Sequence, residues 1–181
     1  MAARKKAAAG RRPIVVDTNV LIAANGSDAE WKPIASRCAD RLRGVMDGSI
    51  VCTDSLGLIL TEYGNKLPSR SRNGFGDMFY LWLARNRSNG EFCQTVAITP
   101  NETGFEEFPD LTEELAAIID PSDRKFIAVA HAHPEKPPIL EATDSKWIGW
   151  KDGLAGAGIT IDFVDESFLR PYYERKMGQG D

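Results

Sequence analysis

The chain has 181 residues, 43% of them hydrophobic, and a net charge of −4, which suits one domain with its own core. No apolar run reaches the roughly 18 residues that a membrane span needs, and alanines follow the basic N-terminus where a secretory signal would carry an apolar core. The 3 cysteines are widely spaced, which argues against a disulfide framework or a zinc motif. We therefore expect a cytoplasmic protein with no membrane segment.

Charge and pattern divide the chain into three parts. Residues 1–12 carry positive charges and no acid, which predicts a disordered basic arm. This arm is either a solvated tail or a segment that steers nucleic acid. Residues 13–170 are predicted to form one domain, and residues 171–181 a C-terminal tail.

The most informative stretch follows the arm. Residues 14–16 are apolar and β-branched, which predicts a buried strand of a parallel sheet. The run ends at Asp17, and open α/β sheets place their chemistry at the carboxyl ends of strands. Aspartate is also a common helix N-cap, so the stretch alone permits both interpretations.

The next elements alternate in type. Pro33 and apolar residues at helical spacing predict a helix that Gly48 ends, and residues 49–53 predict a short strand. Asp54 is expected to cap a second helix whose apolar residues 56–60 enter the core. Glu62 follows that run. It lies either on the outer edge of the helix or on a buried face, where a carboxylate needs compensation.

Residues 64–90 are the basic part of the domain, with Asp77 as their single acid. Aromatic residues between 75 and 82 predict a helix that packs on the core or on a partner. The basic side chains are either solvated or in contact with a phosphate backbone. The RNA-binding candidates are Lys66, Arg70 and Arg72, together with Arg124 and Lys125 further along the chain.

The third quarter of the chain contains a second informative stretch. Residues 92–98 predict a strand, 102–110 an acidic solvated loop, and 111–119 a short helix with Ile118 among its inward residues. Asp120 is predicted to cap the next helix with Pro121 as its first residue, which places Asp123 in the first turn. His131 and His133 lack metal-ligand spacing and are expected to be structural.

The remaining segments complete the alternation. Residues 138–144 predict a strand that ends in Asp144, 153–158 a glycine-rich linker, and 159–164 an edge strand. Trp147 and Trp150 are expected in the core or in a lid. Strands that alternate with helices predict an α/β fold around a parallel sheet.

Four acids therefore stand where strands end or where buried helices reach the rim of the core. Gathered in one partly desolvated site, such carboxylates repel one another unless a cation binds or their pKa values rise. Hard divalent ions prefer oxygen ligands, and a pair of such ions can drive phosphodiester hydrolysis. These acids are Asp17, Glu62, Asp123 and Asp144.

In motif and order the chain resembles the PIN-domain family over roughly residues 13–163. The residues that carry the resemblance are Val15-Val16-Asp17-Thr18-Asn19-Val20-Leu21, Glu62, Ser122-Asp123-Arg124-Lys125-Phe126-Ile127-Ala128-Val129-Ala130 and Ala142-Thr143-Asp144.

The resemblance implies a three-layer α/β/α fold and metal-dependent cleavage of single-stranded or structured RNA. It implies that Asp17, Glu62, Asp123 and Asp144 bind one or two Mg²⁺ or Mn²⁺ ions, with Asn19 and Thr143 in support. Many small members are toxins neutralised by an antitoxin protein, often as homodimers. The segment between Glu62 and Asp123 is long for such members, and its helix at Phe75–Leu83 and its acidic loop are expected to form a lid or a partner surface.

Two other functions stay open. A non-catalytic PIN-fold module would bind RNA or a protein without metal and without turnover. A phosphatase on a similar sheet would need a second aspartate two residues after its nucleophile, where this chain has Asn19.

Overall fold

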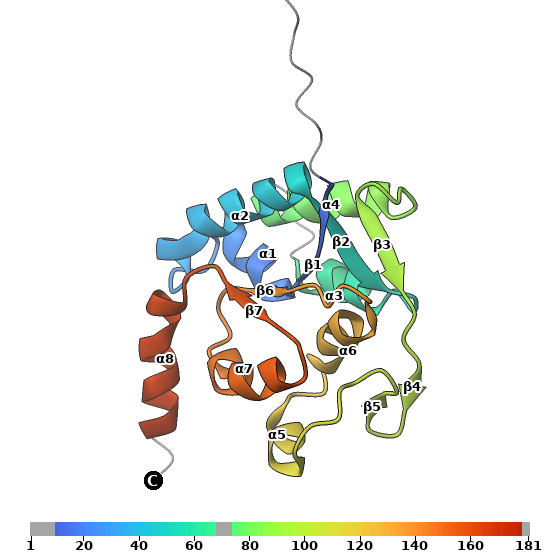
Figure 1. The fold of residues 1–181 in the computed structure, drawn as a ribbon. Coiled ribbons are helices and arrows are strands. Elements are labelled where there is room, and N and C mark those ends of the chain that lie inside the picture. The colour runs from blue at the N-terminus through green and yellow to red at the C-terminus, as the bar shows by residue number, and fades with distance from the viewer. Residues whose placement is uncertain (1–9, 68–73, 179–181) are drawn as a thin grey trace, which may run out of the picture.

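The computed structural model describes residues 10–67 and 74–178 (Figure 1). Its centre is a five-stranded sheet in the order β3-β2-β1-β6-β7, with every neighbouring pair parallel. The strands of the sheet are β1 (Arg12–Val16), β2 (Ser49–Asp54), β3 (Cys93–Val96), β6 (Ile139–Glu141) and β7 (Ile161–Phe163). A small antiparallel hairpin, β4 (Pro100–Asn101) with β5 (Gly104–Phe105), lies outside it.

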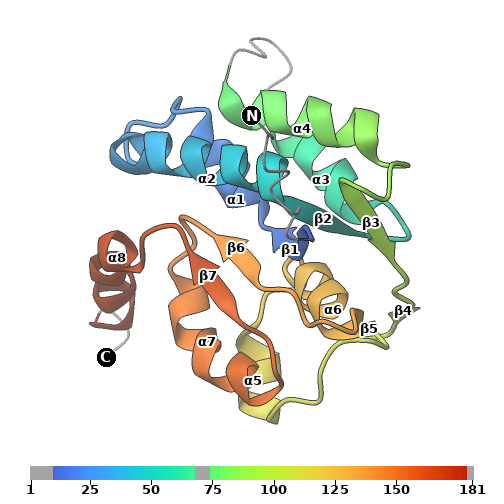
Figure 2. The same cartoon turned by 45° about the horizontal axis from the view of Figure 1, so that its top comes forward.

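Helices cover both faces of the sheet, so the predicted three-layer α/β/α architecture is confirmed (Figure 2). One layer contains α1 (Thr18–Ala24), α2 (Ala35–Gly48), α3 (Leu58–Lys66) and α4 (Phe75–Asn86). The other contains α5 (Glu113–Ile118), α6 (Arg124–Ala132) and α7 (Lys146–Gly156). A 3₁₀ turn, Lys32–Ile34, leads into α2, and α8 (Glu166–Gly178) lies beside the sandwich.

Burial explains why these segments form the sheet. Val15 and Val16 in β1 and Leu140 in β6 are fully buried, because helices cover both faces of a parallel sheet. The N-cap residue of α3 is Gly57, but the Asp54 carboxylate accepts the backbone N–H groups of Leu58 and Ile59 in its first turn, each at 2.8 Å. Trp147 and Trp150 are buried in the core, as expected.

Several predicted boundaries were wrong. Residues 153–158 do not form a linker, because α7 runs to Gly156, and Gly153 gives Leu115 room to pack against it. The predicted acidic loop contains strand β5 of the small hairpin, and Ile118 is 58% exposed and so does not face inward. The strand predicted to end at Asp144 ends at Glu141.

The structure also differs from the predicted domain boundaries at both ends. Arg12 begins β1, where it pairs with Ser49, and the Arg11 guanidinium donates to the carbonyl oxygens of Met46 and Ser49 at 3.0 Å each. Arg11 and Arg12 are therefore part of the fold, whereas residues 1–9 lie outside the described residues. The boundary predicted after residue 170 falls inside α8.

The sheet order creates a topological switch point between β1 and β6. From β1 the chain crosses to β2 and β3 on one side, and it later returns to β6 and β7 on the other. Clefts at the carboxyl ends of strands form where the order reverses in this way. Within residues 10–67 and 74–178, every helix is too short or too polar to cross a membrane.

Candidate functional site

Asp17 is the first residue after β1, at the switch point. It is only 2% exposed, and its backbone N–H donates to the carbonyl of Leu140 at 2.9 Å. It is also the N-cap of α1, because its side chain accepts the backbone N–H of Asn19 at 2.7 Å. Asp17 is therefore both the N-cap of α1 and a carboxylate at the end of a buried strand.

Glu141 is a site residue that the sequence analysis missed. It ends β6, which pairs with β1, and it is fully buried. Its Oε1 accepts the backbone N–H groups of Thr143 and Asp144 at 2.9 Å each, whereas Oε2 has no hydrogen-bond partner among the described residues. A glutamate inside an apolar strand was the available signal, since burying an unpaired carboxylate is costly.

A second group of carboxylates lies at the start of α6 and the end of the β6 loop. One oxygen each from Asp120, Asp123 and Asp144 lies within 4.8 Å of the others. The prediction that Asp120 caps this helix was wrong: residues 120–123 form a turn, the helix begins at Arg124, and Asp123 is its N-cap residue. That turn holds Asp120 beside the site.

We call these carboxylates the acidic cluster and include Glu62 of α3, whose charge acts on Asp17. Its members are Asp17, Glu62, Asp120, Asp123, Glu141 and Asp144. The four acids predicted from the sequence thus lie around one end of the sheet, and two further acids join them.

Burial changes the acidity of the deep members. Desolvation is the main cause that raises the pKa of Asp17 to about 7. The nearby charges of Asp123 and Glu62 also raise this pKa, whereas the hydrogen bond from the Asn19 N–H lowers it. Desolvation and the Asp17 charge raise the pKa of Glu141 well above its usual range. Burial, followed by the Asp144 and Asp120 charges, raises the pKa of Asp123 to about 6.

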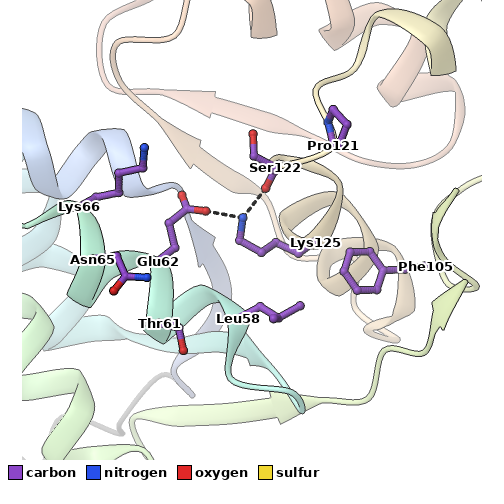
Figure 3. Close-up of a pocket in the computed structure, with 9 residues that line it drawn as sticks. All are labelled: Leu58, Thr61, Glu62, Asn65, Lys66, Phe105, Pro121, Ser122 and Lys125. Atoms are coloured by element: carbon purple, nitrogen blue, oxygen red, sulfur yellow. Dashed lines mark hydrogen bonds and ion pairs between the residues drawn. The ribbon is translucent and has the colours of Figure 1, made fainter. Parts of the chain in front are cut away.

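Glu62 is compensated by groups of the protein itself (Figure 3). Its carboxylate accepts the hydroxyl of Thr18 at 2.5 Å and the ammonium of Lys125 at 2.5 Å. Lys125 also donates to the carbonyl of Ser122, and its side chain is only 8% exposed. Glu62 therefore lies on an inward-facing side of its helix, and the Lys125–Glu62 ion pair joins α6 to α3.

The structure changes the list of RNA-binding candidates. Lys125 is buried in its ion pair, and Arg124 donates to the carbonyls of Thr103 and Ala116, so both face the protein. Lys66 is exposed at the end of α3. Arg70 and Arg72 lie outside the described residues.

Other predicted groups have supporting positions. Asn19 and Thr143 contribute backbone N–H groups to Asp17 and Glu141. Lys146 was not predicted: its ammonium pairs with Asp120 and lies 3.8 Å from Asp144. His133 is buried, with Nε2 3.1 Å from the side-chain oxygen of Gln94.

The fold and the site together define an α/β protein with a central parallel sheet and a carboxylate cluster at the switch point. Its oxygen ligands, three of them within 4.8 Å of one another, are of the kind that holds a hard divalent cation. Comparison with known protein families, with curated proteins and with solved structures gave no match.

Proposed function

We propose that this protein is a metal-dependent endoribonuclease with a PIN-like site. The observation that carries the proposal is the convergence of acids from β1, β6, α3 and the start of α6 on one end of the sheet. Stability of the fold does not explain why these acids lie together, because like charges in a partly buried site oppose folding.

The chain's ligand set fits Mg²⁺ or Mn²⁺. The donors are all carboxylate oxygens, which these ions prefer to thiolate or imidazole ligands. The buried Glu141 Oε2 also lacks a partner among the described residues. Asp123 and Asp144 would hold the metal with Asp120 or Asp17 beside them, whereas both oxygens of Glu62 are already bonded.

Each group of the chain then has a defined task. A bound divalent ion would activate water and stabilise charge on a phosphodiester. Asp17, with a pKa of about 7, exchanges a proton at its carboxylate near neutral pH. Glu141 orients the loop that carries Asp144 by accepting its backbone N–H.

The resemblance to PIN domains extends the proposal to the biological setting. We propose a cytoplasmic RNase, the toxin of a toxin–antitoxin pair, with RNA as substrate, an antitoxin protein as partner and a homodimer as its assembly. A neighbouring reading frame whose product binds this chain and blocks its RNase activity supports that setting. An isolated gene with no such product counts against it.

The test is cleavage of transfer, ribosomal and single-stranded RNA. We expect activity with Mn²⁺, loss with EDTA, and at least a 100-fold loss in Asp17→Asn with the fold retained, as expected for removal of a group that contacts the reacting centre. Asp152→Asn is the matched control, since Asp152 is exposed on α7. A folded Asp17→Asn protein with full activity contradicts the proposal.

A second candidate function, a non-catalytic binding module, is favoured by one observation. The ammonium groups of Lys125 and Lys146 already neutralise Glu62 and Asp120. Such a module would bind its partner equally well in EDTA and in Mn²⁺. Calorimetric titration with Mn²⁺ distinguishes the two, because only the nuclease needs to release heat on binding the ion.

A further inference from the structure

We propose that a pocket beside the acidic cluster binds one unpaired base of single-stranded RNA, an inference that rests on the proposed nuclease function. The pocket lies between α3, β5 and the 120–123 turn and encloses about 360 Å³ (Figure 3). We call it the side pocket. Its volume lies within the roughly 300–1,000 Å³ range of small-ligand sites.

The apolar walls of the side pocket suit a flat ring. Phe105 from β5 and Leu58 from α3 line it on different sides. Arg124 holds this hairpin in place by donating to the carbonyl of Thr103, so the ring of Phe105 has a fixed support. Proteins that read single-stranded RNA commonly stack its unpaired bases on aromatic side chains.

Uncharged polar groups of the pocket can recognise the edge of a base. Thr61 and Asn65 on α3 are exposed, and their side chains take part in none of the hydrogen bonds among residues 10–67 and 74–178. The amide of Asn65 offers both a donor and an acceptor, as a base edge does. Side chains of this kind distinguish one base from another.

The side pocket adjoins the acidic cluster. Glu62 lines the side pocket and belongs to the acidic cluster, and Ser122 in its wall directly precedes Asp123. A base in the pocket therefore brings its adjoining phosphate towards the cluster. Exposed Lys66 also lines the pocket and supplies a positive charge for that backbone.

These features favour RNA over a peptide. An extended peptide is held mainly through main-chain hydrogen bonds at a sheet edge or in a long groove. The side pocket is instead a compact site with one aromatic ring, one amide and the exposed ammonium group of Lys66, beside the Lys125–Glu62 ion pair. That combination matches the ring, edge and phosphate of a single nucleotide.

The test measures binding apart from cleavage. Short labelled RNAs of A, C, G or U are titrated in EDTA with the full chain, and anisotropy gives each Kd. We expect the wild type to favour one base by about 2- to 10-fold, as a single hydrogen bond provides. Asn65→Ala removes that preference. Phe105→Leu weakens all four by about 5- to 150-fold, the equivalent of the loss of one stacked base.

Matched variants keep the inference falsifiable. Phe105→Tyr, which retains the ring, binds like the wild type, and so does Lys176→Ala in α8, whereas Lys66→Ala weakens binding. Unchanged Kd values in Phe105→Leu and Asn65→Ala, with folding verified by circular dichroism, overturn the inference. So does a wild type that binds none of the RNAs, an outcome that would favour a peptide as the occupant.

The proposed function fails separately. If cleavage in Mn²⁺ does not depend on Phe105 or Asn65, the inference of a base pocket is overturned and the proposed nuclease function is unaffected. Pocket-dependent binding without any cleavage in Mn²⁺ overturns the nuclease and supports the pocket.

Discussion

Glu62 and Asp17 are carboxylates of the same cluster, but the protein surrounds them differently. Glu62 accepts hydrogen bonds from Thr18 and Lys125, and its side chain is 22% exposed. Asp17 is 2% exposed, has one bond to a backbone N–H, and lies beside the buried acid Glu141. The nearest hydroxyl in sequence, that of Thr18, points to Glu62 instead.

The difference shows which carboxylate charges are compensated by groups of the protein itself. Glu62 contributes to the contact between α3 and α6, because its charge is matched by an ammonium. Asp17 and Glu141 lack a matching cation in the part of the chain that the structure describes, and desolvation by burial raises the pKa of each. An added cation would stabilise the ionised form of the second kind most, because no ammonium group already does so, and its binding would displace their protons.

The largest expected effect concerns pH. The pKa of Asp17 is 3.8 ordinarily and about 7 in the folded chain, so ionised Asp17 destabilises the folded state. That cost is absent near pH 4 and grows as the pH rises towards 7. Without metal, Asp17→Asn should raise the free energy of unfolding at pH 8 by on the order of 2–4 kcal/mol and change it little at pH 4.

Urea unfolding in EDTA at both pH values measures this effect, with Asp152→Asn as the control that changes neither. Equal effects of Asp17→Asn at the two pH values would contradict the assignment of a raised pKa to Asp17.

Removing the Lys125 ammonium, which pairs with the Glu62 carboxylate, should give the next largest effect. Lys125→Met leaves Glu62 without its ammonium, and we expect the free energy of unfolding to fall by about 2–3 kcal/mol at pH 7. Lys66→Met is the matched control, because Lys66 is exposed. Adding Glu62→Gln to Lys125→Met should recover most of the loss, and additive losses in the double variant would argue against the pair.

The hydroxyl partner of Glu62 should matter less. Thr18→Val keeps the shape of the buried side chain but removes its 2.5 Å bond to the carboxylate. We expect a loss of about 1–2 kcal/mol by thermal or urea unfolding, the range for a hydrogen bond to a charged group. Thr18→Ser keeps the hydroxyl and should lose less; the reverse order of stability would show that the methyl group, not the bond, is responsible.

The smallest effect on stability is expected at Lys146. Its ion pair with Asp120 is solvated, since both side chains are more than 40% exposed, so Lys146→Met should change stability by less than about 1 kcal/mol. Because this ammonium lies beside the oxygens that we propose hold the metal, its loss should tighten Mn²⁺ binding about 2- to 5-fold by calorimetry. Lys151→Met, which removes one of the two cations paired with Glu166, should leave Mn²⁺ affinity unchanged.

Much of the fold was predictable from local pattern. The strands at β1 and β2 and the helices at α2, α3 and α4 follow from apolar spacing and turn residues. Errors arose where local signals were ambiguous. Asp120 and Pro121 fit a helix start, but the chain makes a turn first and the helix begins at Arg124. Asp144 fits a strand end, but Glu141 is the last residue that pairs with β7.

The site was only partly predictable, for a different reason. Asp17, Asp123 and Asp144 stand out because each follows or precedes an apolar run. Glu141 and Asp120 also adjoin apolar residues, but their place in the acidic cluster depends on neighbours distant in sequence. Lys125 shows the limit most clearly: beside Arg124 it suggests a basic surface, yet in the fold it pairs with Glu62, 63 positions away.

The sequence by itself determined the alternation of strands and helices and marked Asp17, Asp123 and Asp144 beside them, because apolar periodicity and capping act over a few residues. Only the tertiary structure decided which carboxylates lie together and which of them is paired with a lysine. That outcome depends on strand order and on burial, and both arise when segments far apart in the chain pack together.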